Sequence, residues 1–303
     1  MDLLEMAATV AQQRVERIQE RAAQREARQE ERREQLAPSL SLAPELGLPG
    51  EPIVLVAEGD SWFDYPGSDV LAELEGVYGY EISSAAHYGH TLESMAYAPK
   101  QLDGLDREMK KLANRGRTPK AVLLSAGGND IAGDEFAILL NHAASGLPAL
   151  NDDVVRGVID VRLKTAFTTL ILAIGGLCER NFGQRDLPVL VHGYANAVPD
   201  GRGFLGGWGP LPGPWLEPGF VAKGYPDLAF NARQVEILID RFNDMLATLP
   251  ALLPHVRVLD VRGDLNSVVA GRAYRTDWAN ELHPEEPAFE RVADRFHQVL
   301  NSI

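Results

Sequence analysis

Ser61 stands at the end of an apolar run, Val54 to Gly59, where the sequence changes to Gly-Asp-Ser. Such a run is typical of a buried parallel strand, and a turn of small residues at its carboxyl end can present one side chain to a cleft. Ser61 is therefore a candidate nucleophile. Because a serine hydroxyl is a weak nucleophile at neutral pH, the chemistry needs a base and a place where negative charge can develop.

Two further polar segments are candidates for these roles, although both lie far from Ser61 in the sequence. The segment Gly127–Asp130 (Gly-Gly-Asn-Asp) follows another apolar run, and His283 lies near the C-terminus in Glu-Leu-His-Pro. A histidine with a pKa near 6.5 can take the serine proton during attack and return it to the leaving group. A Ser–His pair is common by chance in a chain of this length, so its weight depends on the elements that position it.

Short apolar runs alternate with longer segments of helical periodicity from about residue 52 onward. Strands are expected at 53–57, 80–86, 121–126, 187–192 and 256–261. Helices are expected at 69–77, 101–115, 152–181, 231–248 and 285–301. This alternation predicts an α/β fold with a mostly parallel five-stranded sheet, whose ligand crevice lies outside the carboxyl ends of the strands. The first four strands are followed by Ser61, Gly89, Gly127–Asp130 and His192–Asn196, which should therefore share one edge of the sheet.

Residues 1–37 differ in composition from the rest, because arginines and glutamates alternate there, several of them four residues apart. This spacing supports a solvated helix. A short apolar seam runs through Ala11, Val15, Ile18 and Ala22. The seam is too short to predict a coiled coil. We therefore expect a charged helical arm that serves as a solvated tail, a self-association arm or a docking arm, followed by a linker at 38–51 that contains proline and glycine.

Residues 52–303 are expected to form one domain that carries an insertion at 199–227. The insertion is dense in glycine and proline and contains Trp208 and Trp215. This density disfavours helix and central strand, and the aromatic residues argue against disorder. We expect an irregular loop that covers the substrate, with a surface loop anchored by its aromatic residues as the alternative.

The composition limits the kinds of partner. A formal net charge of -14 and a pI near 5.0 argue against binding to nucleic acid or to anionic membrane surfaces. The single cysteine, Cys178, excludes an intrachain disulfide and is expected in the core. No apolar run reaches the roughly 18 residues that span a bilayer, and the N-terminus lacks the basic-then-apolar order of a signal peptide. We therefore expect a soluble cytoplasmic protein without a transmembrane segment.

Four blocks, in order, resemble those of the SGNH (GDSL) hydrolase family: Gly59-Asp60-Ser61, Tyr88-Gly89-His90-Thr91, Gly127-Gly128-Asn129-Asp130 and His283-Pro284. The resemblance extends from residue 53 to about 300. It implies a flavodoxin-like three-layer α/β/α sandwich and ester hydrolysis through an acyl-serine intermediate. It also implies that Ser61 is the nucleophile and His283 the general base, with an oxyanion hole made by the Ser61 and Gly89 N–H groups and the Asn129 amide. The residue types suit these roles, because glycine lets the backbone approach a substrate oxygen and an amide donates without titrating.

The chain departs from the family at the third triad position. The family places an aspartate three residues before the histidine, where this chain has Asn280. An Asn oxygen can accept the His283 Nδ1–H bond, but it supplies no charge to the imidazolium. Asp277 and Glu281 are acidic residues near enough to substitute if the loop folds back. We expect Asn280 to orient His283, with Asp277 second and a backbone carbonyl third, and we expect no catalytic role for Asp60.

Two other functions compete with ester hydrolysis. A metal-dependent phosphoesterase would draw its ligands from His87, His90, His192, His283, Asp60, Asp64, Asn129 and Asp130. The histidines lack the paired spacing of such a site, and His87 and His90 are expected to line or abut the cleft or to pack structurally. A non-catalytic binding protein on a hydrolase-like scaffold is the other alternative, and the retention of all four blocks disfavours it. We expect no metal and no cofactor, and a small-molecule, lipid or sugar ester as substrate.

Overall fold

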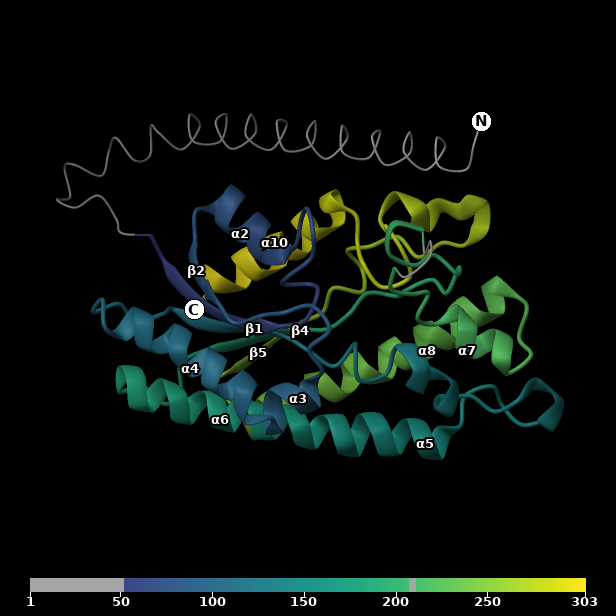
Figure 1. Ribbon diagram of the computed structural model, residues 1–303, viewed down its shortest axis with the longest axis horizontal. Coiled ribbons are helices and arrows are strands. Elements are labelled where there is room, and N and C mark those ends of the chain that lie inside the picture. Colours follow the sequence, from purple (N-terminus) through teal and green to yellow (C-terminus); the bar gives the residue numbers. More distant parts are fainter. Residues whose placement is uncertain (1–51, 207–210) are drawn as a thin grey trace.

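The structure is a computed structural model that describes residues 52–206 and 211–303. The expected arm at 1–37 and the linker at 38–51 lie outside these residues, as do 207–210 of the insertion. Five strands form one sheet (Figure 1): β1 (Val54–Gly59), β2 (Glu81–Ser84), β3 (Ala121–Ser125), β4 (Val189–His192) and β5 (Val256–Leu259). Neighbouring strands are all parallel, in the order β2-β1-β3-β4-β5. This is the flavodoxin-like order, so the expected fold class is confirmed.

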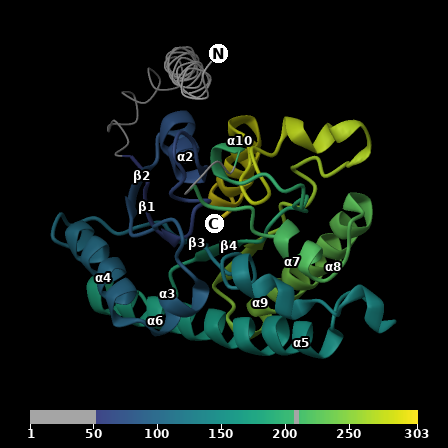
Figure 2. The same cartoon turned by 45° about the vertical axis from the view of Figure 1, so that its right-hand side comes forward.

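Helices cover both faces of the sheet (Figures 1 and 2). They are α2 (Val70–Tyr78), α3 (Leu92–Tyr97), α4 (Pro99–Ala113), α5 (Asp152–Arg156), α6 (Lys164–Phe182), α7 (Glu217–Ala222), α8 (Leu228–Ala247), α9 (Leu249–Leu252) and α10 (Glu286–Leu300). Short 3₁₀ segments are η2 (Gly133–Leu139), η3 (Ala143–Ser145), η5 (Phe204–Gly206) and η6 (Ala270–Thr276), and η4 (Gly157–Leu163) is a π-helical segment. Helices α2 and α10 pack together on one face, and α3, α4 and α6 pack together on the other, which makes three layers.

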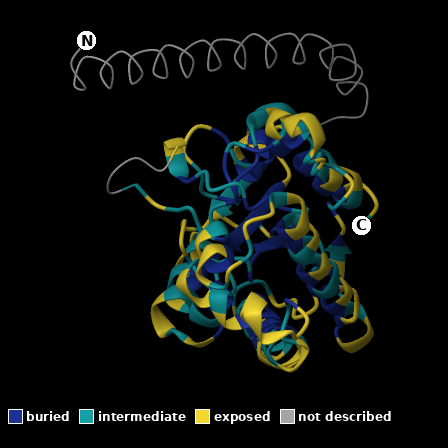
Figure 3. Ribbon diagram, turned by 90° about the vertical axis from the view of Figure 1, so that its right-hand side faces the viewer, coloured by how far each residue is buried: buried dark blue, intermediate teal, exposed yellow. Residues whose placement is uncertain are grey.

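The central strands are apolar because they are buried on both faces. Every residue of β1, β3 and β4 is buried. Val56 of β1 lies between Ser83 of β2 and Val122 of β3, which shows how β1 is enclosed within the sheet. Figure 3 shows the buried residues gathered in the sheet and on the helix faces that meet it. The loops after β1, β3 and β4 therefore emerge at one edge, as the sequence predicts.

The expected strands and long helices all have counterparts, whereas the short helices α3, α7 and α9 were not expected. Helix α3 begins at a capping box in which Thr91 and Ser94 bond each other's backbone, a short-range signal that was present in the sequence. The expectation that the insertion contains no helix is wrong, because α7 occupies Glu217–Ala222. Pro218 lies in the first turn of α7, where an N–H group would have no helical partner, so its proline ring does not prevent the helix.

Helices α5 and α6, joined by the π-type turn η4, form one helical segment of 31 residues from Asp152 to Phe182. With a mean hydropathy of 1.4 in its most apolar window, the segment is long and apolar enough to cross a membrane. Charged residues such as Asp160, Arg162 and Lys164 interrupt it, so it contains no uninterrupted apolar run of this length. Its buried face packs beneath α3 and α4, which is typical of a core helix that covers a sheet. Cys178 on this face is buried as expected, and burial raises the pKa of its thiol to about 12.

Candidate active site

Ser61 follows β1 directly, at the carboxyl edge of the sheet. The turn before it is closely packed: a Cβ on Gly59 would lie 2.9 Å from the Ser125 side chain, so no larger residue fits without displacement. Asp60 is buried, and its Oδ1 accepts hydrogen bonds from the Trp62 N–H (3.0 Å) and the Ser125 hydroxyl (2.7 Å). These bonds hold the turn that presents Ser61, which agrees with a structural role for Asp60.

His283 lies against Ser61, although the two residues are far apart in the sequence. Its Nε2 is 2.7 Å from the Ser61 Oγ. The two loops are joined directly, because the Trp62 indole N–H donates to the Leu282 carbonyl at 3.1 Å. The Tyr65 ring stacks on the imidazole with 4.3 Å between ring centroids. A bond between the loops and a ring against the imidazole therefore hold His283 at the serine.

Asn280 determines which nitrogen of His283 carries the proton. Its Oδ1 accepts the backbone N–H groups of Leu282 (2.9 Å) and His283 (3.0 Å), so the oxygen of this amide, and not the nitrogen, must face them. The same oxygen lies 3.0 Å from His283 Nδ1, which therefore donates. The Asn280 nitrogen donates to the Tyr65 hydroxyl at 3.1 Å. Nε2 is left with a lone pair that faces Ser61, the tautomer that a general base requires.

The other candidates for orienting His283 have different partners. Asp277 accepts the Asn266 N–H at 2.7 Å and forms an ion pair with Arg291 at 2.7 Å. The Glu281 carboxylate accepts backbone N–H groups of the insertion. Of the residues weighed from the sequence, the structure brings Asn280 to His283.

His283 has an unusual electrostatic setting for a base. The residue is only 6% exposed, and its hydrogen-bond partners are neutral groups. Burial without a charged partner lowers the pKa of His283 to about 3. The imidazole is therefore neutral, and able to accept a proton, well into the acidic range.

The first prediction concerns this pH range. We expect kcat/KM for a neutral ester to stay level from pH 8 down to about 5, because the neutral form of His283 persists there. Replacing Asn280 with aspartate keeps the acceptor and adds a charge that stabilises the imidazolium. The pKa of His283 should then rise, and the acid limb of the profile should move up by about one pH unit or more.

The measurement is the pH–rate profile of wild type and Asn280→Asp, with circular dichroism at each pH to report folding. Asp277→Asn serves as the control and should keep the wild-type profile. A wild-type acid limb centred near pH 6.5, or superimposable profiles for wild type and Asn280→Asp, would show that this account of His283 is wrong.

Asn129 lies in the loop after β3 and lines the same cavity as Ser61. One N–H of its amide is held by the His90 carbonyl at 2.9 Å, and an amide nitrogen carries a second N–H for another acceptor. Gly89, next to His90, has a φ of 80°, in the left-handed region that favours glycine. Within the described chain, the N–H groups of Ser61 and Gly89 donate to no other group. Gly89 itself is not among the residues that line the cavity.

The residues weighed as metal ligands are bonded in other ways. His90 Nδ1 lies 3.2 Å from the buried carboxylate of Glu58. Asp64 and Asp130 accept backbone N–H groups from the segment that follows β2. His192 is buried, and burial lowers its pKa to about 4. In the part of the chain that the structure describes, no three His, Cys, Asp or Glu side chains are grouped to hold a metal ion.

A cavity of about 50 Å³ lies beside Ser61. Its apolar lining comes mainly from Trp62, Tyr194, Ala195, Ala197, Ile239 and Trp278. The only polar atom of the Tyr194 side chain is satisfied, since the hydroxyl donates to Asp60. The cavity therefore offers an apolar compartment next to the serine.

Sequence reasoning missed three aromatic residues at this site. Trp62 and Tyr65 lie within a few residues of Ser61, and that proximity was the available signal. Trp215, from the insertion, approaches the imidazole of His283 edge-on, with 5.5 Å between ring centroids. Nothing local in the sequence relates Trp215 to His283.

No family model and no curated protein matches the chain. Solved structures do match. A protein classed as a GDSL-like lipase from Parabacteroides merdae is 13% identical with a TM-score of 0.46, over 83% of this chain and 96% of that one. A variant of an acetyl-xylooligosaccharide esterase from Geobacillus is 14% identical with a TM-score of 0.44, over 83% and 95%. A GDSL-like lipase from Bacteroides thetaiotaomicron is 12% identical with a TM-score of 0.39, over 89% and 97%. These similarities concern the fold, and the chemistry rests on this chain's own residues.

Proposed function

We propose that this chain is a serine hydrolase of the SGNH type that cleaves carboxylic esters through an acyl-Ser61 intermediate. The observation that carries the proposal is a continuous line of hydrogen-bonding atoms. Ser61 Oγ lies 2.7 Å from His283 Nε2, and His283 Nδ1 lies 3.0 Å from Asn280 Oδ1. A nucleophile, a base in the correct tautomer and a residue that orients the base are thus aligned.

In the proposed reaction, Ser61 Oγ attacks the ester carbonyl carbon while its proton passes to His283 Nε2. The tetrahedral oxyanion accepts hydrogen bonds from the Ser61 and Gly89 N–H groups and from the second N–H of the Asn129 amide. His283 returns the proton to the departing alcohol, which leaves an acyl-serine. Water then attacks the acyl-serine with His283 again as base, releasing the carboxylic acid and restoring Ser61. Each proton transfer uses groups of this chain and water, so the reaction needs no cofactor.

The apolar cavity favours a short acyl group. One water-sized group requires about 10–15 Å³ of cavity volume, so a cavity of about 50 Å³ has room for roughly three to five carbon-sized groups. Burying one methylene contributes about 0.8 kcal/mol, which is roughly a fourfold change in kcat/KM. Acetyl to butyryl esters therefore fit the cavity, and longer chains extend beyond it.

The second prediction is an acyl-chain preference. Among p-nitrophenyl esters, kcat/KM should rise by up to about fourfold per methylene from acetate to butyrate, and fall by roughly tenfold or more at octanoate. Ile239 on α8 lines the cavity, so Ile239→Ala should move the optimum to longer chains. Ile237→Ala is the matched control, because Ile237 is 48% exposed on the same helix. A wild-type optimum at octanoate or beyond would rule out this cavity as the acyl site.

A further inference from the structure

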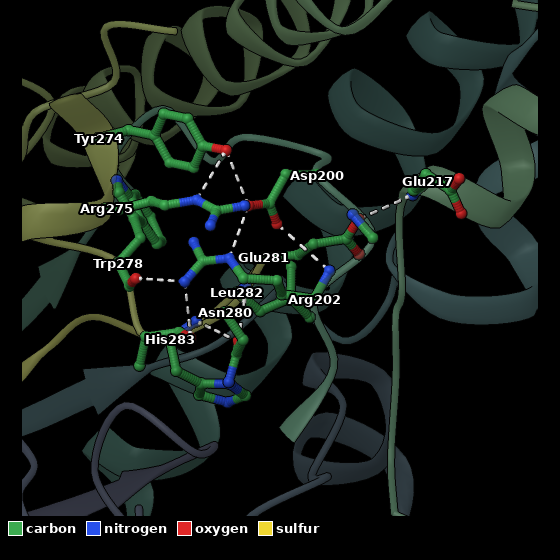
Figure 4. Close-up of polar contacts among 12 residues, drawn as sticks. Asp200, Arg202, Glu217, Tyr274, Arg275, Trp278, Asn280, Glu281, Leu282 and His283 are labelled. Atoms are coloured by element: carbon green, nitrogen blue, oxygen red, sulfur yellow. Dashed lines mark hydrogen bonds and ion pairs between the residues drawn. The ribbon is translucent and has the colours of Figure 1, made fainter. Parts of the chain in front are cut away.

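Glu281 joins the loop that carries His283 to the insertion (Figure 4). Its Oε1 accepts the N–H groups of Gly201 (2.9 Å) and Glu217 (3.1 Å), and its Oε2 accepts those of Trp215 (2.6 Å) and Leu216 (2.7 Å). These donors come from the beginning of the insertion (Gly201) and from its middle (Trp215 to Glu217), so one carboxylate joins these two segments.

The Glu281 carboxylate is fully buried, and burial raises its pKa while the N–H donors lower it. Within the described residues its hydrogen bonds go to backbone N–H groups, and it forms no ion pair with a basic side chain. A buried carboxylate is costly unless its lone pairs are satisfied, and here each oxygen has two donors. The arrangement is specific to a carboxylate, since an amide at this position would turn an NH₂ group toward two N–H groups.

The insertion bonds back to the same loop. The Glu281 N–H donates to the Arg202 carbonyl at 3.2 Å. The Arg202 guanidinium in turn donates to the carbonyl of Trp278 at 2.9 Å, as Figure 4 shows, and to that of Ala279 at 3.0 Å. Arg202 is itself held by Asp200 at 2.6 Å. The loop that carries His283 and the insertion are therefore bonded in both directions.

The hydrogen bonds of Glu281 also place Trp215 next to His283. Glu281 precedes His283 by two residues, and it binds the backbone of Trp215, whose indole ring meets the imidazole edge-on at 5.5 Å. Trp215 is therefore held against His283 both by its backbone and by its ring.

We propose that Glu281 is a positioning residue: its carboxylate holds the insertion against the loop of His283, so that Trp215 shields the imidazole beside Ser61. The expected effect of Glu281 on activity rests on the proposed function. The expected effect of Glu281 on the pKa of His283 can be measured without ester hydrolysis.

The test compares wild type with Glu281→Gln and with Glu179→Gln. Glu179 is the matched control, because it lies exposed on α6 and its carboxylate bonds Arg185 at 2.7 Å. Three quantities are measured: the pKa of His283 by NMR titration, the rate of trypsin cleavage after Arg202, and kcat/KM for p-nitrophenyl butyrate.

In Glu281→Gln, the pKa of His283 should rise by about one unit or more as water reaches the ring, and cleavage after Arg202 should accelerate. Activity should fall by about 10- to 100-fold, mainly in kcat. The control should match wild type in all three measurements. An unchanged pKa of His283 in Glu281→Gln, even with lower activity, would overturn the inference, because a merely structural residue would not move it.

Trp215→Ala is the second variant and removes the shield while keeping the Glu281 carboxylate. It should raise the pKa of His283 even if Glu281→Gln does not fold, and an unchanged pKa would overturn the inference. If wild type hydrolyses no ester while the NMR and trypsin results follow expectation, the proposed function fails and the role of Glu281 in holding the insertion stands.

Discussion

Replacing Ser61 with alanine is expected to lower kcat/KM for p-nitrophenyl butyrate by about 10⁴-fold or more. In the proposed reaction, the substitution removes the atom that forms the acyl-enzyme, while His283 and the proposed oxyanion donors remain. Ser61 Oγ is bonded to His283 Nε2 at 2.7 Å, so its loss costs one hydrogen bond in a site that is otherwise unchanged. Steady-state kinetics with ester and thermal unfolding in parallel give the two readouts.

Thermal unfolding should show that Ser61→Ala stays folded. Ser145→Ala, at an exposed serine in η3, is the control and should keep wild-type activity. Retention of more than about one hundredth of wild-type activity by Ser61→Ala would mean that another group is the nucleophile.

Replacing Asn129 with alanine is expected to lower kcat by about 10²–10³-fold with little change in KM. The amide is held by the His90 carbonyl at 2.9 Å, so its second N–H is already oriented before the substrate arrives. A donor oriented in advance stabilises the oxyanion more than the ground-state carbonyl, and the loss therefore appears in kcat.

Asn114→Ala, at the exposed end of α4, serves as the control for replacing an asparagine and should leave kcat unaltered. The kinetic constants are compared at equal active-site concentration. A loss of less than about fivefold in Asn129→Ala would remove this residue from the oxyanion hole.

The sequence predicted the sheet well for a physical reason. Strands β1, β3 and β4 are buried on both faces, so their apolar runs stand out without any knowledge of the neighbouring elements. Loops at the carboxyl ends of parallel strands share an edge, which is why Ser61, Gly89 and Asn129 could be grouped before their contacts were known.

The orienting role of Asn280 could also be predicted from the sequence, because Asn280 lies three residues before His283 and bonds the backbone of its own loop. What the sequence could not give was the partner of Glu281. Its donors lie 64 to 80 residues away, in an insertion without hydrophobic periodicity. Backbone N–H groups also carry no signature in the side-chain sequence, so a carboxylate that binds four of them looks like any other acidic residue.

The structure of the insertion could also be predicted only in part from the sequence. Its glycines and prolines predict irregular backbone, and most of the described part is irregular, yet α7 forms within it. Pro218 is compatible with a helix only in the first turn, and whether a helix begins there depends on its surroundings. Gly219 packs so closely on Phe136 that a Cβ would lie 2.6 Å from the ring, a tertiary contact that no local pattern reveals.

In the proposed function, Ser61 is a nucleophile activated by His283. A fluorophosphonate reacts covalently with such a serine, and intact-protein mass spectrometry with peptide mapping locates the adduct. We predict one adduct per chain on Ser61 in wild type, none in Ser61→Ala, and labelling slowed by at least about 100-fold in His283→Ala. Folded wild-type protein that takes up no phosphonate, or takes it up at another residue, would contradict the account.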